Sequence, residues 1–159
     1  MRSILGFTVI MVILFCCDEQ RVYEKNFDFN SRYWVASEKP EFEFEIADTL
    51  ATYNLYGNVR NSLEYPYANI FLTYYLQDST GALLGKDLVR QSLFDDKTGE
   101  PHGDSGLGDL YDHRVALKTN HMFPYAGKYK VAFEHYMRTD TLFGVLAVGL
   151  RVERGSPPN

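Results

Sequence analysis

The sequence predicts an all-β protein, an antiparallel β-sandwich of about seven to eight strands, on three observations. Tyrosine and phenylalanine are abundant, with 12 Tyr and 11 Phe among 159 residues, and both residue types favour half-buried pleated surfaces. Several segments alternate apolar and polar residues with a period of two, which is the period of a strand. No segment keeps a 3.6-residue period over three turns. Short strands separated by polar turns are typical of a sandwich.

The first element is an N-terminal signal. Arg2 precedes an unbroken apolar run from Ile4 to Phe15, which stops at Cys16 and Cys17. Twelve residues in a helix span about 18 Å, whereas a membrane-spanning helix needs ~20 residues. A charged start, a short apolar core and a small-residue boundary predict that residues 1–16 are a signal peptide.

The boundary resembles a bacterial lipobox, LFCC, which implies cleavage before a cysteine that then carries lipid. Cys17 is the better candidate for the lipidated residue, because Cys16 before the cut is small and Phe15 is not. An ordinary secretory signal with stray thiols is the alternative, and a vicinal Cys16–Cys17 disulfide would be strained. No cysteine follows Cys17, so the sequence predicts no disulfide and no thiolate metal site in the mature domain.

The elements of the mature chain follow in order. Residues 17–39 are expected to be a lipidated tether and a first edge strand, residues 40–154 the sandwich domain, and residues 155–159 a disordered tail. Alternation, apolar runs and turn residues predict the further strands. These strands cover residues 41–46, 54–60, 68–77, 83–93, 115–122, 128–138 and 143–152. Residues 94–109 are expected to form a long loop.

The charge of the chain limits its partners. The formal net charge is −5, and removing the signal with Arg2 makes it −6, with no basic cluster. Nucleic acid is excluded as a partner because its phosphates demand a basic face. Membrane attachment therefore depends on the acyl chains, of which two or three give a stable anchor.

Possible catalytic and metal sites are weak in this sequence. Gly103–Gly106 (GDSG) is similar to a serine-protease nucleophile segment, but the base and the orienting carboxylate are missing, so a polar turn is preferred. The loop with Asp95, Asp96, His102, Asp104, Asp109 and Asp112 has oxygen ligands for a calcium ion but no EF-hand order. His113, His121 and His135 form no short-spaced zinc pair, and a core position is expected for His135. We predict no enzyme, no cofactor and no metal site.

Two surface hypotheses remain. Exposed rings of Tyr65, Tyr67, Tyr74 and Tyr75 would make a sugar-binding face, although adjacent Tyr74 and Tyr75 must point to opposite sides of a strand. The charged residues Glu134, Arg138, Asp140 and Arg151 would make an ion-pair patch for orienting a partner. Ordinary core packing and solvated strand faces are the preferred interpretations of both sets.

Several stretches in collinear order resemble the GldH family of gliding motility lipoproteins. They are PEFEFEIADTL from Pro40 with YNLYGNVRN after it, YPYANIFLTYYL, GLGDLYDHR at 106–114, and FPYAGKYKVAFEHYMRTDTLFGVLAVGLRVE at 123–153. The loop at 100–105 departs from the family pattern. No single motif is diagnostic, but together with the lipobox these stretches span nearly the whole mature chain.

The resemblance implies a non-catalytic, membrane-attached accessory or scaffold of the gliding and type IX secretion apparatus. It supplies no catalytic residue, and the one residue carried over is Cys17 as the lipidation site. The expected partners are the membrane, through acyl chains such as palmitate, and other gliding or secretion proteins of the cell envelope; no small-molecule substrate is expected. Which membrane holds the protein, inner or outer, stays open. The alternative function is an envelope lipoprotein that binds glycans.

Overall fold

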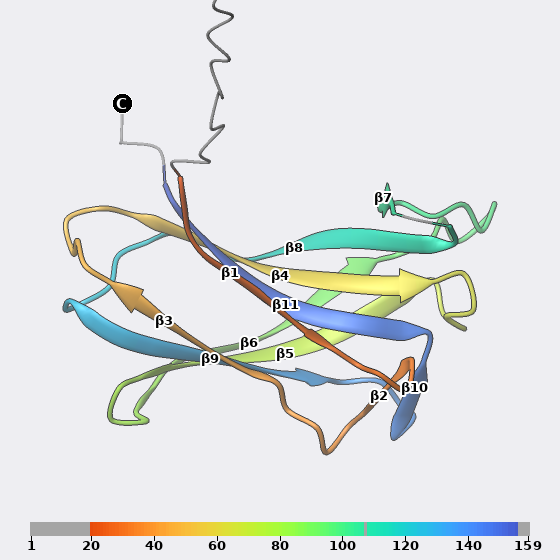
Figure 1. Ribbon diagram of the computed structural model, residues 1–159, viewed down its shortest axis with the longest axis horizontal. Helices are drawn as coiled ribbons and strands as arrows, with labels where there is room; N and C mark the ends of the chain where they lie inside the picture. Colours follow the sequence, from red (N-terminus) through yellow and green to blue (C-terminus); the bar gives the residue numbers. More distant parts are fainter. Residues whose placement is uncertain (1–19, 107, 156–159) are drawn as a thin grey trace, which may run out of the picture.

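The computed structural model describes residues 20–106 and 108–155. It is an antiparallel β-sandwich, so the predicted fold class is confirmed (Figure 1). The first sheet has the strand order β1-β11-β4-β8-β7. Its strands are β1 (Arg21–Asp28), β11 (Val145–Arg154), β4 (Tyr53–Ser62), β8 (Leu110–His121) and β7 (Asp104–Ser105).

The second sheet lies below the first in Figure 1 and has the order β3-β9-β5-β6. Its strands are β3 (Glu41–Ile46), β9 (Gly127–His135), β5 (Asn69–Asp78) and β6 (Leu83–Ser92). A small third sheet pairs β2 (Tyr33–Val35) with β10 (Thr141–Phe143). All pairings between these strands are antiparallel.

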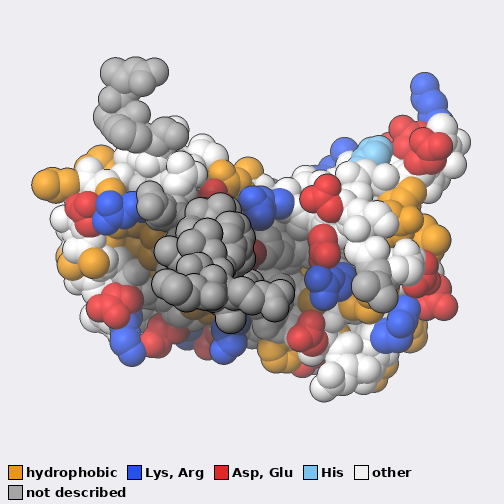
Figure 2. Space-filling model, turned by 45° about the horizontal axis from the view of Figure 1, so that its top comes forward, with side chains coloured by type: hydrophobic (Ala, Val, Ile, Leu, Met, Phe, Trp, Pro, Cys, Tyr) orange, Lys and Arg blue, Asp and Glu red, His pale blue; other side chains and the backbone are white. Residues whose placement is uncertain are grey.

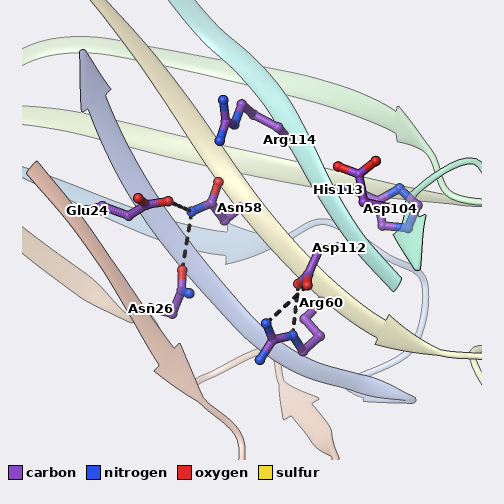
Figure 3. Close-up of a pocket in the computed structure, with 8 residues that line it drawn as sticks. All are labelled: Glu24, Asn26, Asn58, Arg60, Asp104, Asp112, His113 and Arg114. Carbon is purple, nitrogen blue, oxygen red and sulfur yellow. Dashed lines mark hydrogen bonds and ion pairs between the residues drawn. The ribbon is translucent and has the colours of Figure 1, made fainter. Parts of the chain in front are cut away.

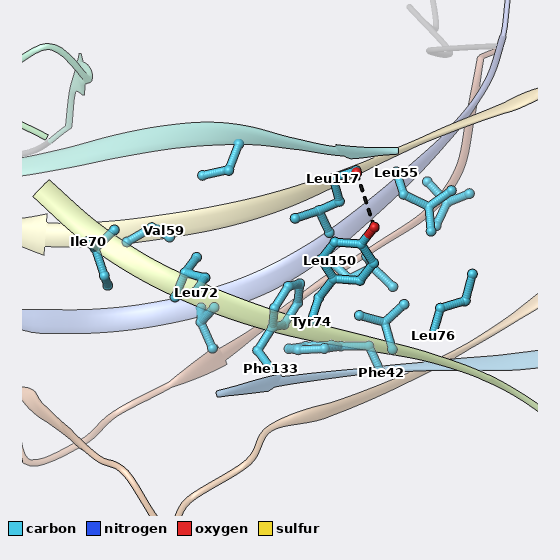
Figure 4. Packing of buried hydrophobic residues seen from close by; sticks show 14 of the residues in the cluster. Phe42, Leu55, Val59, Ile70, Leu72, Tyr74, Leu76, Leu117, Phe133 and Leu150 are labelled. Atoms are coloured by element: carbon cyan, nitrogen blue, oxygen red, sulfur yellow. Dashed lines mark hydrogen bonds between the residues drawn. The ribbon is translucent and has the colours of Figure 1, made fainter. Parts of the chain in front are cut away.

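The core lies between the two larger sheets and follows from the period of two in their strands. In β3, Phe42, Phe44 and Ile46 are buried while the glutamates between them are exposed. In β4, Leu55 and Val59 point inward, as their spacing predicted. Figure 4 shows side chains of both sheets meeting in this layer.

Aromatic rings close the two ends of the core. At one end, Phe123 contacts the rings of Phe44, Tyr53 and Tyr129 at centroid distances of 5.8, 5.6 and 4.5 Å. At the other end, Trp34 is fully buried and its Nε1 donates a hydrogen bond to Glu38 O at 2.7 Å. Such edge and offset ring contacts add stability beyond the buried area.

The described residues form eleven strands, where about seven to eight were expected, and several segments differ from the sequence expectations. Residues 17–39 contain two strands, β1 and β2, and not one. The strand expected at 115–122 begins at Leu110, and the strand expected at 143–152 is two strands, β10 and β11. The loop at 94–109 contains the short strand β7 and an isolated bridge between Phe94 and Pro101. β1 is an edge strand, as expected for the first strand of the mature chain.

The described chain begins and ends at the same end of the sandwich. Arg21 in β1 pairs with Glu153 in β11, and Arg154 N donates to Gln20 O at 2.7 Å. We call this the terminal end and the opposite one the distal end. The loop arm with β7 rises from the distal end in Figure 1.

Candidate functional site

A polar hollow of about 400 Å³ lies on the outer face of the five-stranded sheet, between β1 and the loop arm that carries β7. Its volume falls in the range of roughly 300–1,000 Å³ that small-ligand sites occupy. Figure 3 shows its lining residues, which come from β1, β4, β7 and β8. They are Glu24, Asn26, Asn58, Arg60, Asp104, Asp112, His113 and Arg114.

The strand register explains why the sheet is hollowed here. Four residues form one row across neighbouring strands: Asn26 on β1, Gly149 on β11, Asn58 on β4 and Arg114 on β8. Because Gly149 has no side chain, the outer surface of the sheet is recessed in the middle of this row. A Cβ atom at Gly149 would collide with the Asn26 side chain, so the hollow depends on glycine at this position.

The side chains of the hollow are held by one another. The Asn58 amide donates to Glu24 Oε1 at 3.1 Å and to Asn26 Oδ1 at 3.3 Å, as the dashed lines in Figure 3 show. Arg60 binds the Asp112 carboxylate through two hydrogen bonds, of 2.8 and 3.1 Å. Bidentate pairs of this kind fix the geometry of both partners.

The charges of the hollow are largely compensated. Arg151 donates to Glu24 at 2.7 Å, and Arg114 lies 3.7 Å from a Glu153 oxygen. Partial burial opposes ionisation of Glu24, but hydrogen bonds from Arg151, Arg21 and Asn58 outweigh it and lower the pKa of this carboxyl. Figure 2 shows acidic and basic side chains interspersed on this face. A neutral polar ligand therefore suits the hollow better than a polyanion.

His113 borders the hollow from beneath the loop arm. Its residue is 5% exposed, and its Nε2 atom accepts or donates no hydrogen bond within the described residues. Burial lowers the pKa of its imidazole, so the ring is neutral at pH 7. Gly103 packs against it, because a Cβ there would lie 2.7 Å from the imidazole Nε2.

The hollow offers free hydrogen-bonding groups. Asn58 Oδ1 and Asn26 Nδ2 have no partner among the described residues, and Asp104 has no ion pair there. A nucleophile next to a general base is missing from the residues that line the hollow. Within residues 20–106 and 108–155, no group of three His, Cys, Asp or Glu residues is placed to hold a metal ion.

An apolar groove of about 380 Å³ lies at the distal end of the other sheet. Tyr136 follows β9, and its N donates to Phe71 O at 2.8 Å, while Met137 Sδ accepts from Phe71 N at 3.4 Å. Tyr136 is 68% exposed and Leu88 46% exposed. We call this the distal groove, and it is lined by Tyr67, Phe71, Leu88, Tyr136, Met137 and Arg138.

The four tyrosines of the proposed sugar-binding face do not come together. Tyr65 and Tyr74 are core residues, 4% and 2% exposed, and Tyr74 OH donates to Leu117 O at 3.3 Å (Figure 4). Adjacent residues of a strand point to opposite faces, so Tyr75 points outward because Tyr74 points into the core. The Tyr75 hydroxyl donates to Glu134 Oε2 at 2.6 Å. Tyr67 lines the distal groove.

The ion-pair patch proposed on the last hairpin is not formed either. Glu134 lies on β9 and pairs with Lys39 at 3.1 Å, whereas Arg151 lies on β11 in the other sheet and pairs with Glu24. In the acidic loop, Asp95 Oδ1 accepts hydrogen bonds from Lys97 N and Thr98 N and so forms a turn. His135 is buried against Trp34, with ring centroids 5.2 Å apart, which confirms its core position.

A family model described as GldH lipoprotein matches residues 21–152. This range runs from Arg21, the first residue of β1, to Val152 near the end of β11, and so contains both larger sheets.

The chain belongs to the GldH lipoprotein family.

The chain is also similar over nearly its whole length to two proteins that carry the GldH name. It is 28% identical over 96% of its length, and 95% of the relative's, to a gliding motility lipoprotein GldH homolog of Christiangramia forsetii. It is 26% identical over 90% of its length, and 91% of the relative's, to the gliding motility lipoprotein GldH of Flavobacterium johnsoniae.

Among solved structures, one match is VP2 of the infectious bursal disease virus subviral particle, with a TM-score of 0.44 and 16% identity. The match covers 94% of this chain and 37% of the VP2 chain.

Cys17, the predicted lipidation site, lies outside the described residues. None of the residues that the structure describes forms a helix long and apolar enough to cross a membrane. Sequence reasoning did not find the polar hollow. Its asparagines, Asn26 and Asn58, are 32 positions apart, and only the strand register brings them together.

Proposed function

We propose that this member of the GldH family is a lipid-anchored protein of the cell envelope that is required for gliding motility. It is anchored by acyl chains on Cys17 and acts without catalysis, by binding other envelope proteins of the gliding and type IX secretion apparatus. The observation that carries the proposal is the family match over residues 21–152, since both curated relatives are named gliding motility lipoproteins.

The distal groove is the surface that best suits a protein partner. Aromatic residues, Met and Arg are enriched at the centres of protein interfaces, and the groove contains all three kinds. Its occupant is an apolar segment of another envelope protein, whose side chains enter the groove beside Tyr136 and Leu88. Anchoring confines the domain and its partners to one membrane surface, so a modest contact is sufficient for function.

Complementation of a deletion strain tests the proposal. The wild-type chain is expected to restore gliding, and the Cys17→Ala chain is expected not to. The double variant Leu88→Asp/Tyr136→Asp keeps the anchor but lowers the yield of cross-linked partners about tenfold or more, as loss of an aromatic anchor does. Leu83→Asp is the matched control, because Leu83 lies on the same strand, is 55% exposed and is outside the groove.

Two results would contradict the proposal. One is full gliding by the Cys17→Ala chain at wild-type abundance, since that removes the need for the anchor. The other is loss of gliding in the groove variant without any change in the cross-linked proteins, since the groove would then have another role.

The polar hollow supports a second function, the binding of a neutral saccharide. Each sugar hydroxyl both donates and accepts a hydrogen bond, which matches the free Asn58 Oδ1 and Asn26 Nδ2 atoms beside the compensated charges of Arg60 and Asp112. Glycan binding is therefore proposed at the polar hollow and not at the four tyrosines. It lies on the other sheet from the distal groove, so both functions are compatible.

Calorimetric titration with neutral oligosaccharides tests the second function. The probes are cello-, manno- and chito-oligosaccharides, added to the full chain in a detergent without a sugar headgroup. Binding is expected to weaken at least tenfold in Asn58→Leu and to be unchanged in Gln77→Leu, a matched change on the outer face of the other sheet. Binding of uronic-acid oligosaccharides alone, or equal binding by Asn58→Leu, would exclude the site.

A further inference from the structure

The distance between the proposed anchor and the folded domain is short. Three peptide steps separate Cys17 from Gln20, the first described residue, and a fully extended chain covers at most about 3.6 Å per residue. Gln20 therefore lies within roughly 11 Å of the lipidated residue. This step rests on the lipidation of Cys17 in the proposed function.

The terminal end of the sandwich must then face the membrane. Gln20 O accepts the hydrogen bond from Arg154 N, and Gly155 N donates to Thr52 O at 2.8 Å. Tyr53, the next residue, pairs with both Arg154 and His121. The loop between β3 and β4 and the loop between β8 and β9 consequently lie beside the start of the described chain.

These two loops expose apolar side chains. Leu50 is 89% exposed, Met122 56% and Tyr125 38%. A single exposed apolar residue needs no explanation, but here all three lie on adjacent loops at the tethered end. Tyrosine is a residue type that collects at the headgroup level of membranes.

The charges around these loops do not oppose contact with a zwitterionic surface. Arg154 and Asp48 form an ion pair at 3.4 Å beside Leu50. Hydrogen bonds from Thr80 and Tyr125 lower the pKa of Asp78 to about 2, so this carboxylate is held by its neighbours. The negative charge of the chain gives no attraction to anionic lipids, and the contact therefore depends on apolar side chains.

We propose that the terminal end of the sandwich is a membrane-contacting surface, with Leu50, Met122 and Tyr125 inserted among the lipid headgroups. The acyl chains hold the domain at the bilayer, and the three side chains fix its orientation. The strands then stand away from the membrane. β5 has ten residues from Asn69 to Asp78, so the distal groove is raised by up to about 30 Å at ~3.3 Å per residue.

Quenching of tryptophan fluorescence by brominated lipid tests this orientation. The full lipidated chain is reconstituted in phosphatidylcholine vesicles with brominated acyl chains, with a tryptophan introduced by Leu50→Trp, Met122→Trp or Leu63→Trp. Leu63 is the matched control, since it is 52% exposed at the distal end. The native Trp34 is fully buried at that end and gives a constant background.

The terminal tryptophans are expected to lose at least twice as large a fraction of their fluorescence as the Leu63→Trp tryptophan. Equal quenching at the two ends, with the protein still attached to vesicles, would overturn the orientation and leave the anchor intact. Association of copies through Leu50 and Met122 without quenching would overturn it as well. Mass spectrometry that finds no acyl group on Cys17 would overturn the anchor itself, and with it this inference.

Discussion

His113, His121 and His135 lie at three separate places in the sandwich, and burial lowers the pKa of each imidazole below its ordinary value of 6.5. His113 and His135 are 5% and 3% exposed. Both rings are packed in the interior, and His113 also borders the polar hollow. His121 contacts the ring of Phe123 with centroids 4.7 Å apart.

These lowered pKa values predict that the fold weakens in mild acid. The unfolded chain takes up protons on these rings near pH 6.5, whereas the folded chain does so only at lower pH. Stability is therefore fully present above about pH 6.5 and is lost as the pH falls. Each ring contributes a slope of at most about 1.4 kcal/mol per pH unit. Urea unfolding of the full chain from pH 7.5 to pH 5 measures this slope.

A substitution separates the histidines from other titrating groups. His135→Gln keeps a polar side chain of similar size and is expected to flatten the pH dependence. Gln77→Asn, which leaves every histidine in place, is the control and is expected to leave the slope unchanged. An unfolding midpoint that stays constant or rises toward pH 5 would show that these rings do not titrate on unfolding. The carboxylates with lowered pKa values, such as Glu24 and Glu43, act below this pH range.

At the scale of elements, alternation identified the strands whose two faces differ most. β3 is the clearest example, because Glu41, Glu43 and Glu45 are exposed and pair in register with β9, where Lys128 and Lys130 form ion pairs with Glu43 and Glu41. The apolar run at 68–77 predicts a strand, and β5 (Asn69–Asp78) confirms it; this strand lies between β9 and β6.

The errors occurred where tertiary contacts decide the structure. Gly144 divides the last predicted strand because its φ of +78° suits glycine, and a Cβ there would lie 2.6 Å from Tyr65 N. The sequence showed a glycine at this position but not the chain packed against it. β8 begins at Leu110, earlier than expected, because it pairs there with Ser62 at the end of β4.

The candidate sites were harder to predict than the strands for the same reason. The tyrosines were chosen by residue type, yet Tyr65 and Tyr74 supply core volume. The polar hollow depends on the alignment of Asn26, Gly149 and Asn58 on three strands distant in sequence. The alternation of apolar and polar residues within one strand does not predict such an alignment, because it follows only from the register of β1, β11 and β4.

At the scale of the whole molecule, the two ends of the sandwich have different surroundings. The terminal end carries the start of the described chain and the exposed Leu50 and Met122, while the distal end carries the groove at Tyr136. If the anchor holds the terminal end at the bilayer, the distal groove stays at a fixed distance from the membrane, and partners must present their apolar segment at that distance. The function of the protein then depends on the length of the tether between Cys17 and the domain.

A longer tether is therefore expected to impair the protein without unfolding it. Twelve Gly/Ser residues inserted after Asp18 add a flexible coil of about 20 Å root-mean-square length, which lets the domain tumble and lowers the effective concentration of the groove at its partner. Gliding and the yield of cross-linked partners should both fall, and the quenching of Leu50→Trp should approach that of Leu63→Trp. The same twelve residues inserted after Gly155 are the control, because they leave the spacing between Cys17 and the domain unchanged. Unchanged gliding with the longer tether would show that the height and orientation of the domain do not matter, even where the lipid does.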